Sequence, residues 1–226
     1  MNTIRKTPVQ EVAVTADLRR PNHICSQVKQ EVIVLRDASP SMDGDKARQA
    51  QAACEEMTDT LAQPINKGGF VMAVADFNDK AYLVQDWKPA ADLAGHIRPL
   101  RLSNCTNITD ALRLANELLD THQRDPSVKY LRPVALVFSD GCHNTGESPD
   151  NEANRLKAKA DIVSVAFGDD ADENLLMSIA STSQHFYRVQ NGAELRNFMA
   201  AVGDTLTITM AQKRDATQAL TKVIPQ

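Results

Sequence analysis

From residue 32 onward, short apolar runs alternate with amphipathic helical patterns, and this alternation constrains the fold more than any other feature of the sequence. Four apolar runs, at residues 32–35, 70–77, 134–138 and 162–167, are typical of strands buried on both faces. An alternation of strand and helix predicts a mostly parallel sheet. We therefore expect an α/β fold, with a doubly wound, Rossmann-like central sheet and helices on both of its faces.

The segments between these strands carry the helical patterns. Helices are predicted at 46–62, from 108 onward, and at 150–159, 172–181 and 193–206. The pattern from residue 108 is the clearest, because its apolar residues recur every three or four positions. The turn pair Asn78-Asp79, followed by the short run 81–84, predicts a hairpin and hence one antiparallel edge strand. Another short strand is expected at 185–189.

The two ends of the chain differ from its centre. Residues 1–30 are expected to form a short N-terminal β-extension, since 9–18 reads as a strand before the breaker at Pro21. Residues 31–207 form the predicted main domain, and 208–226 a C-terminal tail with a short helix near 216–223.

Composition limits the classes of function. The 226 residues are 42% hydrophobic and carry a net charge of −4, which gives no basic surface for nucleic acid or an anionic membrane. The first residues lack the apolar stretch of a secretory signal, and no run approaches the roughly 18 apolar residues of a membrane span. These features predict a cytoplasmic location with reduced cysteines.

Polar side chains gather where the predicted strands end. Asp37, Ser39 and Ser41 follow the run 32–35, Asp140 follows 134–138, and Thr106 precedes the helix that starts near 108. The carboxyl ends of parallel strands meet at one edge of a sheet, where strand order reverses. Carboxylate and hydroxyl oxygens are the ligands that Mg²⁺ prefers. We therefore expect these five side chains to form one magnesium site, with the strands before Asp37 and Asp140 as neighbours.

Three motifs in order resemble a known family. The run D-A-S-P-S-M is similar to the DxSxS motif of von Willebrand factor A-type domains, C-T-N-I-T-D-A-L resembles their threonine motif, and F-S-D-G matches their S/T-D-G motif. Together they resemble a metal ion-dependent adhesion site, and the resemblance covers roughly residues 31–207. It implies that Ser39 and Ser41 ligate Mg²⁺ (or Mn²⁺ or Ca²⁺) directly, and Thr106 directly or through water. Asp37 and Asp140 would hold coordinated waters.

The sequence departs from the family pattern at three places. Pro40 replaces the usual glycine, Asn104-Cys105 replaces a glycine pair, and Arg36 stands where an apolar residue is common. We expect Arg36 to be a solvated or ion-paired charge at the rim of the site. His143 is expected to be a solvated loop residue.

The resemblance also implies a function. It predicts a protein–protein interaction module, and not an enzyme, whose cation binds a Glu or Asp of a partner. With no secretory signal, the chain resembles stand-alone bacterial cytoplasmic members, some of which are associated with tellurite resistance. Their partners suggest a kinase, a phosphatase or a chaperone-type ATPase. No nucleic acid or membrane partner is expected.

An enzyme and an inert site are the alternatives. A haloacid-dehalogenase-like phosphohydrolase would use Asp37 as its nucleophile, Mg²⁺ as its cofactor and Asp169-Asp170 as its late carboxylate pair. That chemistry needs an acid two residues after the nucleophile, where this chain has Ser39. The acidic residues from 169 to 172 are more simply a loop and a helix cap. A purely structural or vestigial metal site is the third reading.

Overall fold

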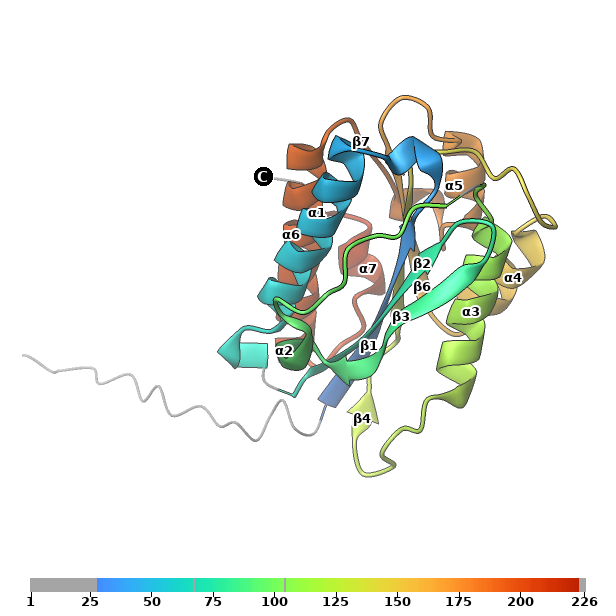
Figure 1. Ribbon diagram of the computed structural model, residues 1–226. Coiled ribbons are helices and arrows are strands. Elements are labelled where there is room, and N and C mark those ends of the chain that lie inside the picture. Colours follow the sequence, from blue (N-terminus) through green and yellow to red (C-terminus); the bar gives the residue numbers. More distant parts are fainter. Residues whose placement is uncertain (1–27, 67, 104, 224–226) are drawn as a thin grey trace, which may run out of the picture.

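The computed structural model describes residues 28–66, 68–103 and 105–223, and its centre is a seven-stranded sheet (Figure 1). The strand order is β3-β2-β1-β5-β6-β7, with the short β4 paired to the start of β1. The strands are β1 (Val28–Asp37), β2 (Phe70–Phe77), β3 (Ala81–Pro89), β4 (Lys129–Tyr130), β5 (Val134–Ser139), β6 (Asp161–Phe167) and β7 (Phe186–Val189). Every pairing is parallel except β2 with β3, which confirms the predicted sheet and its antiparallel edge strand.

Helices cover both faces of the sheet, as predicted. In Figure 1, α1, α6 and α7 lie on one side and α3, α4 and α5 on the other. The helices are α1 (Asp45–Leu61), α2 (Ala90–Leu93), α3 (Ile108–Thr121), α4 (Asp150–Lys157), α5 (Glu173–Ile179), α6 (Gly192–Ala211) and α7 (Thr217–Leu220).

Two hydrophobic cores result, one on each face, and β1 shows how a continuous apolar run serves both. Val32 and Val34 point to the α1–α6 side, whereas Ile33 and Leu35 belong to the core under α3. Successive side chains of a strand point to opposite faces, so each face receives every second residue. This central strand is therefore apolar throughout instead of alternating with polar residues.

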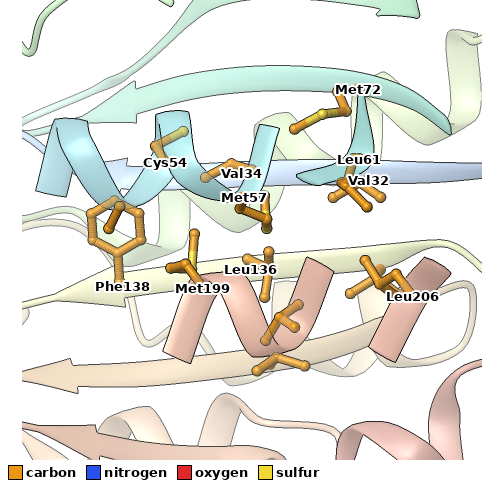
Figure 2. Packing of buried hydrophobic residues seen from close by; sticks show 14 of the residues in the cluster. Val32, Val34, Cys54, Met57, Leu61, Met72, Leu136, Phe138, Met199 and Leu206 are labelled. Carbon is orange, nitrogen blue, oxygen red and sulfur yellow. The ribbon is translucent and has the colours of Figure 1, made fainter. Parts of the chain in front are cut away.

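The first core lies between the sheet and the pair α1–α6. Figure 2 shows Met57 and Leu61 of α1 and Met199 and Leu206 of α6 gathered over the strands. Gly203 lets the two helices approach, because a Cβ added there would lie 2.9 Å from Cγ2 of Thr60. The contact of these helices closes this face of the sheet, and α1 is the helix that follows the Ser39–Ser41 loop.

Several elements differ in extent from the sequence-based expectation. The first strand starts earlier, at Val28; β3 is longer than the predicted run 81–84; and α6 continues beyond residue 206. β4 was missed because two residues carry no periodicity. His185 lies in a 3-10 turn before β7, where its buried ring hydrogen-bonds Thr182 and the backbone oxygen of Thr217.

The C-terminal residues join the first core. Ala216, Leu220 and Val223 are buried in the cluster formed by α1, α6 and the sheet. The strand expected at 9–18 lies outside the described residues, and the proposed divisions at 30 and 207 stay predictions. None of the helices in the described part of the chain is long and apolar enough to cross a membrane.

Candidate metal centre

The carboxyl ends of β1 and β5 place the two aspartates of the site next to each other. These strands are parallel neighbours, with Arg36 opposite Phe138 in the register, so Asp37 and Asp140 leave the sheet at the same edge. From β1 the chain builds outward through β2 and β3 on one side, while β5, β6 and β7 extend the other. The site therefore lies where strand order reverses, as predicted.

Asp37 forms the buried floor of the site. Its Oδ1 accepts a hydrogen bond from the backbone N–H of Ser39 at 2.8 Å, and its Oδ2 accepts one from the Ser139 hydroxyl. Burial raises the pKa of Asp37 from 3.8 to about 6, although the hydrogen bonds from Ser139 and Ser39 oppose the shift; the negative charge of Asp140 adds to it. A positive charge placed here would be favoured, because it would stabilise a carboxylate that the protein alone stabilises poorly.

The three hydroxyls converge on one small space. The Oγ atoms of Ser39 and Ser41 are 2.9 Å apart, and Ser41 donates to Oδ1 of Asp140 at 2.7 Å. Gly141 lies against all three hydroxyls: a Cβ added there would be 3.3 Å from Oγ of Ser41, 3.5 Å from Oγ1 of Thr106 and 4.0 Å from Oγ of Ser39. The structure therefore brings together all five side chains that the sequence singled out.

The loop that carries Thr106 is held by contacts distant in sequence. Cys105 has a φ of +66°, the left-handed conformation that glycine adopts most easily. A non-glycine residue in this conformation costs on the order of 1 kcal/mol. Thr106 and Asn144 bind each other twice, through Thr106 N–H to Oδ1 (2.9 Å) and Asn144 N–H to the Thr106 carbonyl (3.1 Å). Asn107 then caps α3 by accepting from the N–H of Asp110.

Lys46 is a site residue that the sequence reasoning missed. Its ammonium group donates to Oδ2 of Asp140 at 2.5 Å, so the two oxygens of this carboxylate are shared between Lys46 and Ser41. The lysine stands in the first turn of α1, directly after the Ser39–Ser41 loop. Its place just after that loop was the only signal in the sequence that Lys46 reaches the site. The contact itself could not be predicted, because Asp140 is 94 residues away.

His143 and Arg36 differ from expectation. His143 is half-buried rather than solvated: its Nδ1 accepts from the N–H of Ile108 at 3.2 Å, and its Nε2 bonds the carbonyl of Glu147 at 2.9 Å. This ring links the loop after Asp140 to the start of α3. It therefore holds two site-bearing segments together.

Arg36 was expected to be a solvated or ion-paired charge at the rim; the ion pair is confirmed, but the position at the rim is wrong because the side chain is buried. Its side chain is 0% exposed and binds both oxygens of Asp76, at 2.7 and 3.1 Å. It also donates to Oε1 of Gln51 (2.7 Å) and to the carbonyl of Arg98 (3.0 Å). Burial raises the pKa of Asp76, and the positive charge of Arg36 opposes that shift. A buried guanidinium is tolerated here because four hydrogen bonds satisfy it, two of them to the carboxylate of Asp76.

The donor set fits a hard divalent cation. It consists of two carboxylates and three hydroxyls, all oxygen, as Mg²⁺ and Ca²⁺ prefer. In the described ranges no group of three or more His, Cys, Asp or Glu side chains could hold a metal. The thiolate or imidazole cluster typical of a structural zinc site is thus not found among these residues.

The acidic loop of the enzyme alternative has structural roles of its own. Asp169 pairs with Arg188 at 3.0 Å, and the side chain of Asp172 caps α5 by accepting from the N–H of Leu175. The loop-and-cap interpretation of these residues is confirmed for both.

Comparisons with known proteins agree with this geometry. The family model for the von Willebrand factor type A domain matches residues 31–201. Inter-alpha-trypsin inhibitor heavy chain H3 of Rattus norvegicus is 25% identical over 168 residues, which are 71% of this chain and 19% of the relative. The chain thus spans about a fifth of the length of this curated relative.

Solved structures share the fold. Proximal thread matrix protein 1 from the mussel byssus superposes with a TM-score of 0.67 at 21% identity, over 82% of this chain and 49% of that one. Its form with a zinc-occupied MIDAS motif gives 0.65 at 24% identity, over 81% and 46%. The vWF domain of the pilus tip protein Mfa5 from Porphyromonas gingivalis gives 0.65 at 16% identity, over 81% and 97%.

Proposed function

Because the chain belongs to the von Willebrand factor type A family, whose members are generally metal-dependent adhesion and protein-interaction modules, we propose that it is a Mg²⁺-dependent protein-binding domain. The observation that carries the proposal is the convergence of Ser39, Ser41 and Thr106 around Gly141, above the buried carboxylate of Asp37. Buried hydroxyls and carboxylates are costly without a cation or a full set of hydrogen bonds.

Each residue has a distinct part in the proposed site. Ser39 and Ser41 ligate the ion directly, and Thr106 does so directly or through water. Asp37 and Asp140 hold coordinated waters and supply the negative charge. The hard oxygen set favours Mg²⁺, with Mn²⁺ or Ca²⁺ as substitutes, and the zinc found in the mussel relative supports a divalent ion in this arrangement.

The bound ion would supply a coordination position for an external carboxylate. Ser41 and Pro40 are exposed, so this loop of the site is accessible to a partner. A Glu or Asp side chain of that partner would complete the coordination, and the cation would bridge two proteins. A bacterial cytoplasmic setting, and a kinase, phosphatase or chaperone-type ATPase as partner, stay predictions.

Metal binding is tested first, by calorimetric titration of Mn²⁺. Wild type and Ser148→Ala should bind alike, because the Ser148 hydroxyl contacts only Asp150 on the surface. Ser41→Ala and Thr106→Ala should weaken binding at least about tenfold, as expected for the loss of one ligand. Equal binding by all four proteins would place the ion elsewhere.

Partner binding is tested next, with proteins cross-linked in the native lysate and identified by mass spectrometry. A partner should be lost with chelator, restored by Mg²⁺ and absent from the Ser41→Ala sample. Changing its contacting Glu or Asp to the amide should weaken the complex, because a neutral oxygen loses most of the Coulomb attraction to the cation. A complex that survives excess chelator, or Mg²⁺-dependent turnover of a phosphomonoester that Asp37→Asn abolishes, would decide against the proposal.

A further inference from the structure

A groove of about 350 Å³ opens beside the candidate metal centre, between the edge strand β3 and the extended segment that follows α2. Figure 1 shows this segment passing between α1 and β3 toward the start of α3. We call this hollow the β3 groove; the residues used below are Asp76, Asn78, Tyr82, Arg98, Arg101 and Ser103. Its volume lies in the range of pockets that accept side chains or small ligands.

One end of the β3 groove reaches the metal centre. Ser103 lines the groove and donates its N–H to the carbonyl of Ala38, which stands between Asp37 and Ser39. Asn78 lines it too, and its carbonyl accepts from the N–H of Asn107, next to Thr106. The groove is therefore within reach of a partner segment that places one carboxylate at the cation.

The charge in the groove is positive. Arg98 and Arg101 are exposed, and neither guanidinium has a carboxylate partner among the residues described. The one acidic lining residue, Asp76, is neutralised by its two hydrogen bonds to the buried Arg36. The groove thus presents two uncompensated cations, in a chain whose net charge is −4. Such a surface attracts a second acidic group of a partner.

Apolar surface lies in the same place. Tyr82 is 48% exposed and is one of the five large hydrophobic side chains that the described structure leaves exposed. It stands on β3, the outer strand of the sheet, opposite Asp76 in the register and so on the same face as the groove. An exposed tyrosine beside arginines is a combination enriched in protein interfaces.

From these observations, and resting on the proposed function, we propose that the partner presents an acidic segment with a bulky apolar residue. One carboxylate completes the cation site, a second pairs with Arg98 and Arg101, and the apolar side chain packs against Tyr82. A symmetric dimer in which the two grooves face each other is disfavoured, because each groove would bring its two arginines against those of the other.

The experiment selects binders from a phage-displayed library of random 12-residue peptides, in Mg²⁺ and with elution by chelator. Enriched peptides should share two acidic positions and one bulky apolar position at a fixed spacing. A resynthesised peptide should bind the Arg98→Glu/Arg101→Glu variant at least tenfold more weakly than wild type. The matched control, Arg214→Glu, changes an exposed arginine near β4, at the amino ends of the central strands, and should leave the affinity unchanged.

Charge reversal gives the positive counterpart. A peptide whose second acid is replaced by lysine should bind the Arg98→Glu/Arg101→Glu variant better than it binds wild type, still only with Mg²⁺. Circular dichroism and Mn²⁺ titration of the variant should match wild type, since neither arginine side chain bonds another described residue.

The remaining outcomes separate the two proposals. Chelator-eluted peptides that bind wild type and the double variant equally would overturn the role of the groove and leave the metal-dependent function standing. Peptides that need the arginines but ignore chelator would overturn the proposed function. Failure to enrich any peptide would overturn the acidic-segment proposal, and the metal-dependent function would then be decided by the calorimetric and cross-linking tests above. A dimer in sedimentation that Arg101→Glu dissociates would replace the partner segment by a second copy.

Discussion

Replacing Asp37 by asparagine should stabilise the metal-free protein, because the site holds a buried charge that the fold alone stabilises poorly. The carboxylate is 0% exposed, and its pKa is raised from 3.8 to about 6. Each unit of pKa corresponds to about 1.4 kcal/mol of differential interaction, so ionised Asp37 costs about 3 kcal/mol relative to the neutral form. Asparagine resembles that neutral form in size and carries no charge.

The pH dependence follows from the direction of the shift. Between pH 3.8 and about 6 the folded protein holds more protons at Asp37 than the unfolded chain does. The free energy of unfolding therefore falls as the pH rises through this window, and above it the full cost is present. Asp37→Asn should exceed wild type by about 2–3 kcal/mol at pH 7.5, and the difference should shrink toward pH 4.

The assay is urea unfolding followed by circular dichroism, in chelator, at several values of pH. Thermal unfolding gives a second readout: in a chain of this length the same difference in free energy corresponds to a rise in Tm of roughly 5–10 °C. Asp59→Asn is the matched control, because Asp59 is exposed on α1 and the substitution changes the net charge equally. Added Mg²⁺ should stabilise wild type by mass action and leave Asp37→Asn nearly unaffected.

Two results would refute this reasoning. One is an Asp37→Asn variant no more stable than wild type at pH 7.5 in chelator. The other is a stability difference that stays constant from pH 7.5 to pH 4, since a titrating carboxylate cannot produce it.

Three further substitutions probe the surroundings of the site. Arg36→Met should lower the free energy of unfolding by about 3–5 kcal/mol, because Asp76 is left buried without its partner. Urea unfolding measures this, and a loss below about 1 kcal/mol would contradict the prediction. Gly141→Ala should fold normally yet weaken Mn²⁺ binding at least about tenfold in calorimetry, because its Cβ would lie 3.3 Å from Oγ of Ser41. Lys46→Met removes a positive charge from Asp140 and should tighten Mn²⁺ binding by roughly tenfold at low salt; unchanged affinity would mean that the ion pair does not oppose the metal.

Local patterns in the sequence were sufficient for most of the fold and for the members of the site. The apolar runs and the stripe of α3 are properties of neighbouring residues, so their strands and helices could be read directly. The strand–helix alternation then predicted parallel pairing and placed Asp37 and Asp140 at one sheet edge. The structure has the parallel pairing and the two aspartates at one edge. Metal binding by these residues stays a proposal.

Other features escaped the sequence because they carry no local pattern. β4 is two residues long, and Cys105 adopts a left-handed conformation in a loop where only the family motif hinted at glycine. The core contributions of Ala216 and Leu220 were missed because the segment after α6 has too few turns to show periodicity.

The sequence by itself determined the alternation of elements, the central position of β1 and the oxygen-bearing residues at the sheet edge, because each depends on spacing along the chain. Only the tertiary structure decided which charges meet: Arg36 with Asp76 across 40 residues, and Lys46 with Asp140 across 94. It also decided that Arg98 and Arg101 line a groove without a carboxylate partner among the described residues. Coulomb and hydrogen-bond energies depend on distances in space, and folding sets those distances between residues whose separation in the sequence gives no hint of contact.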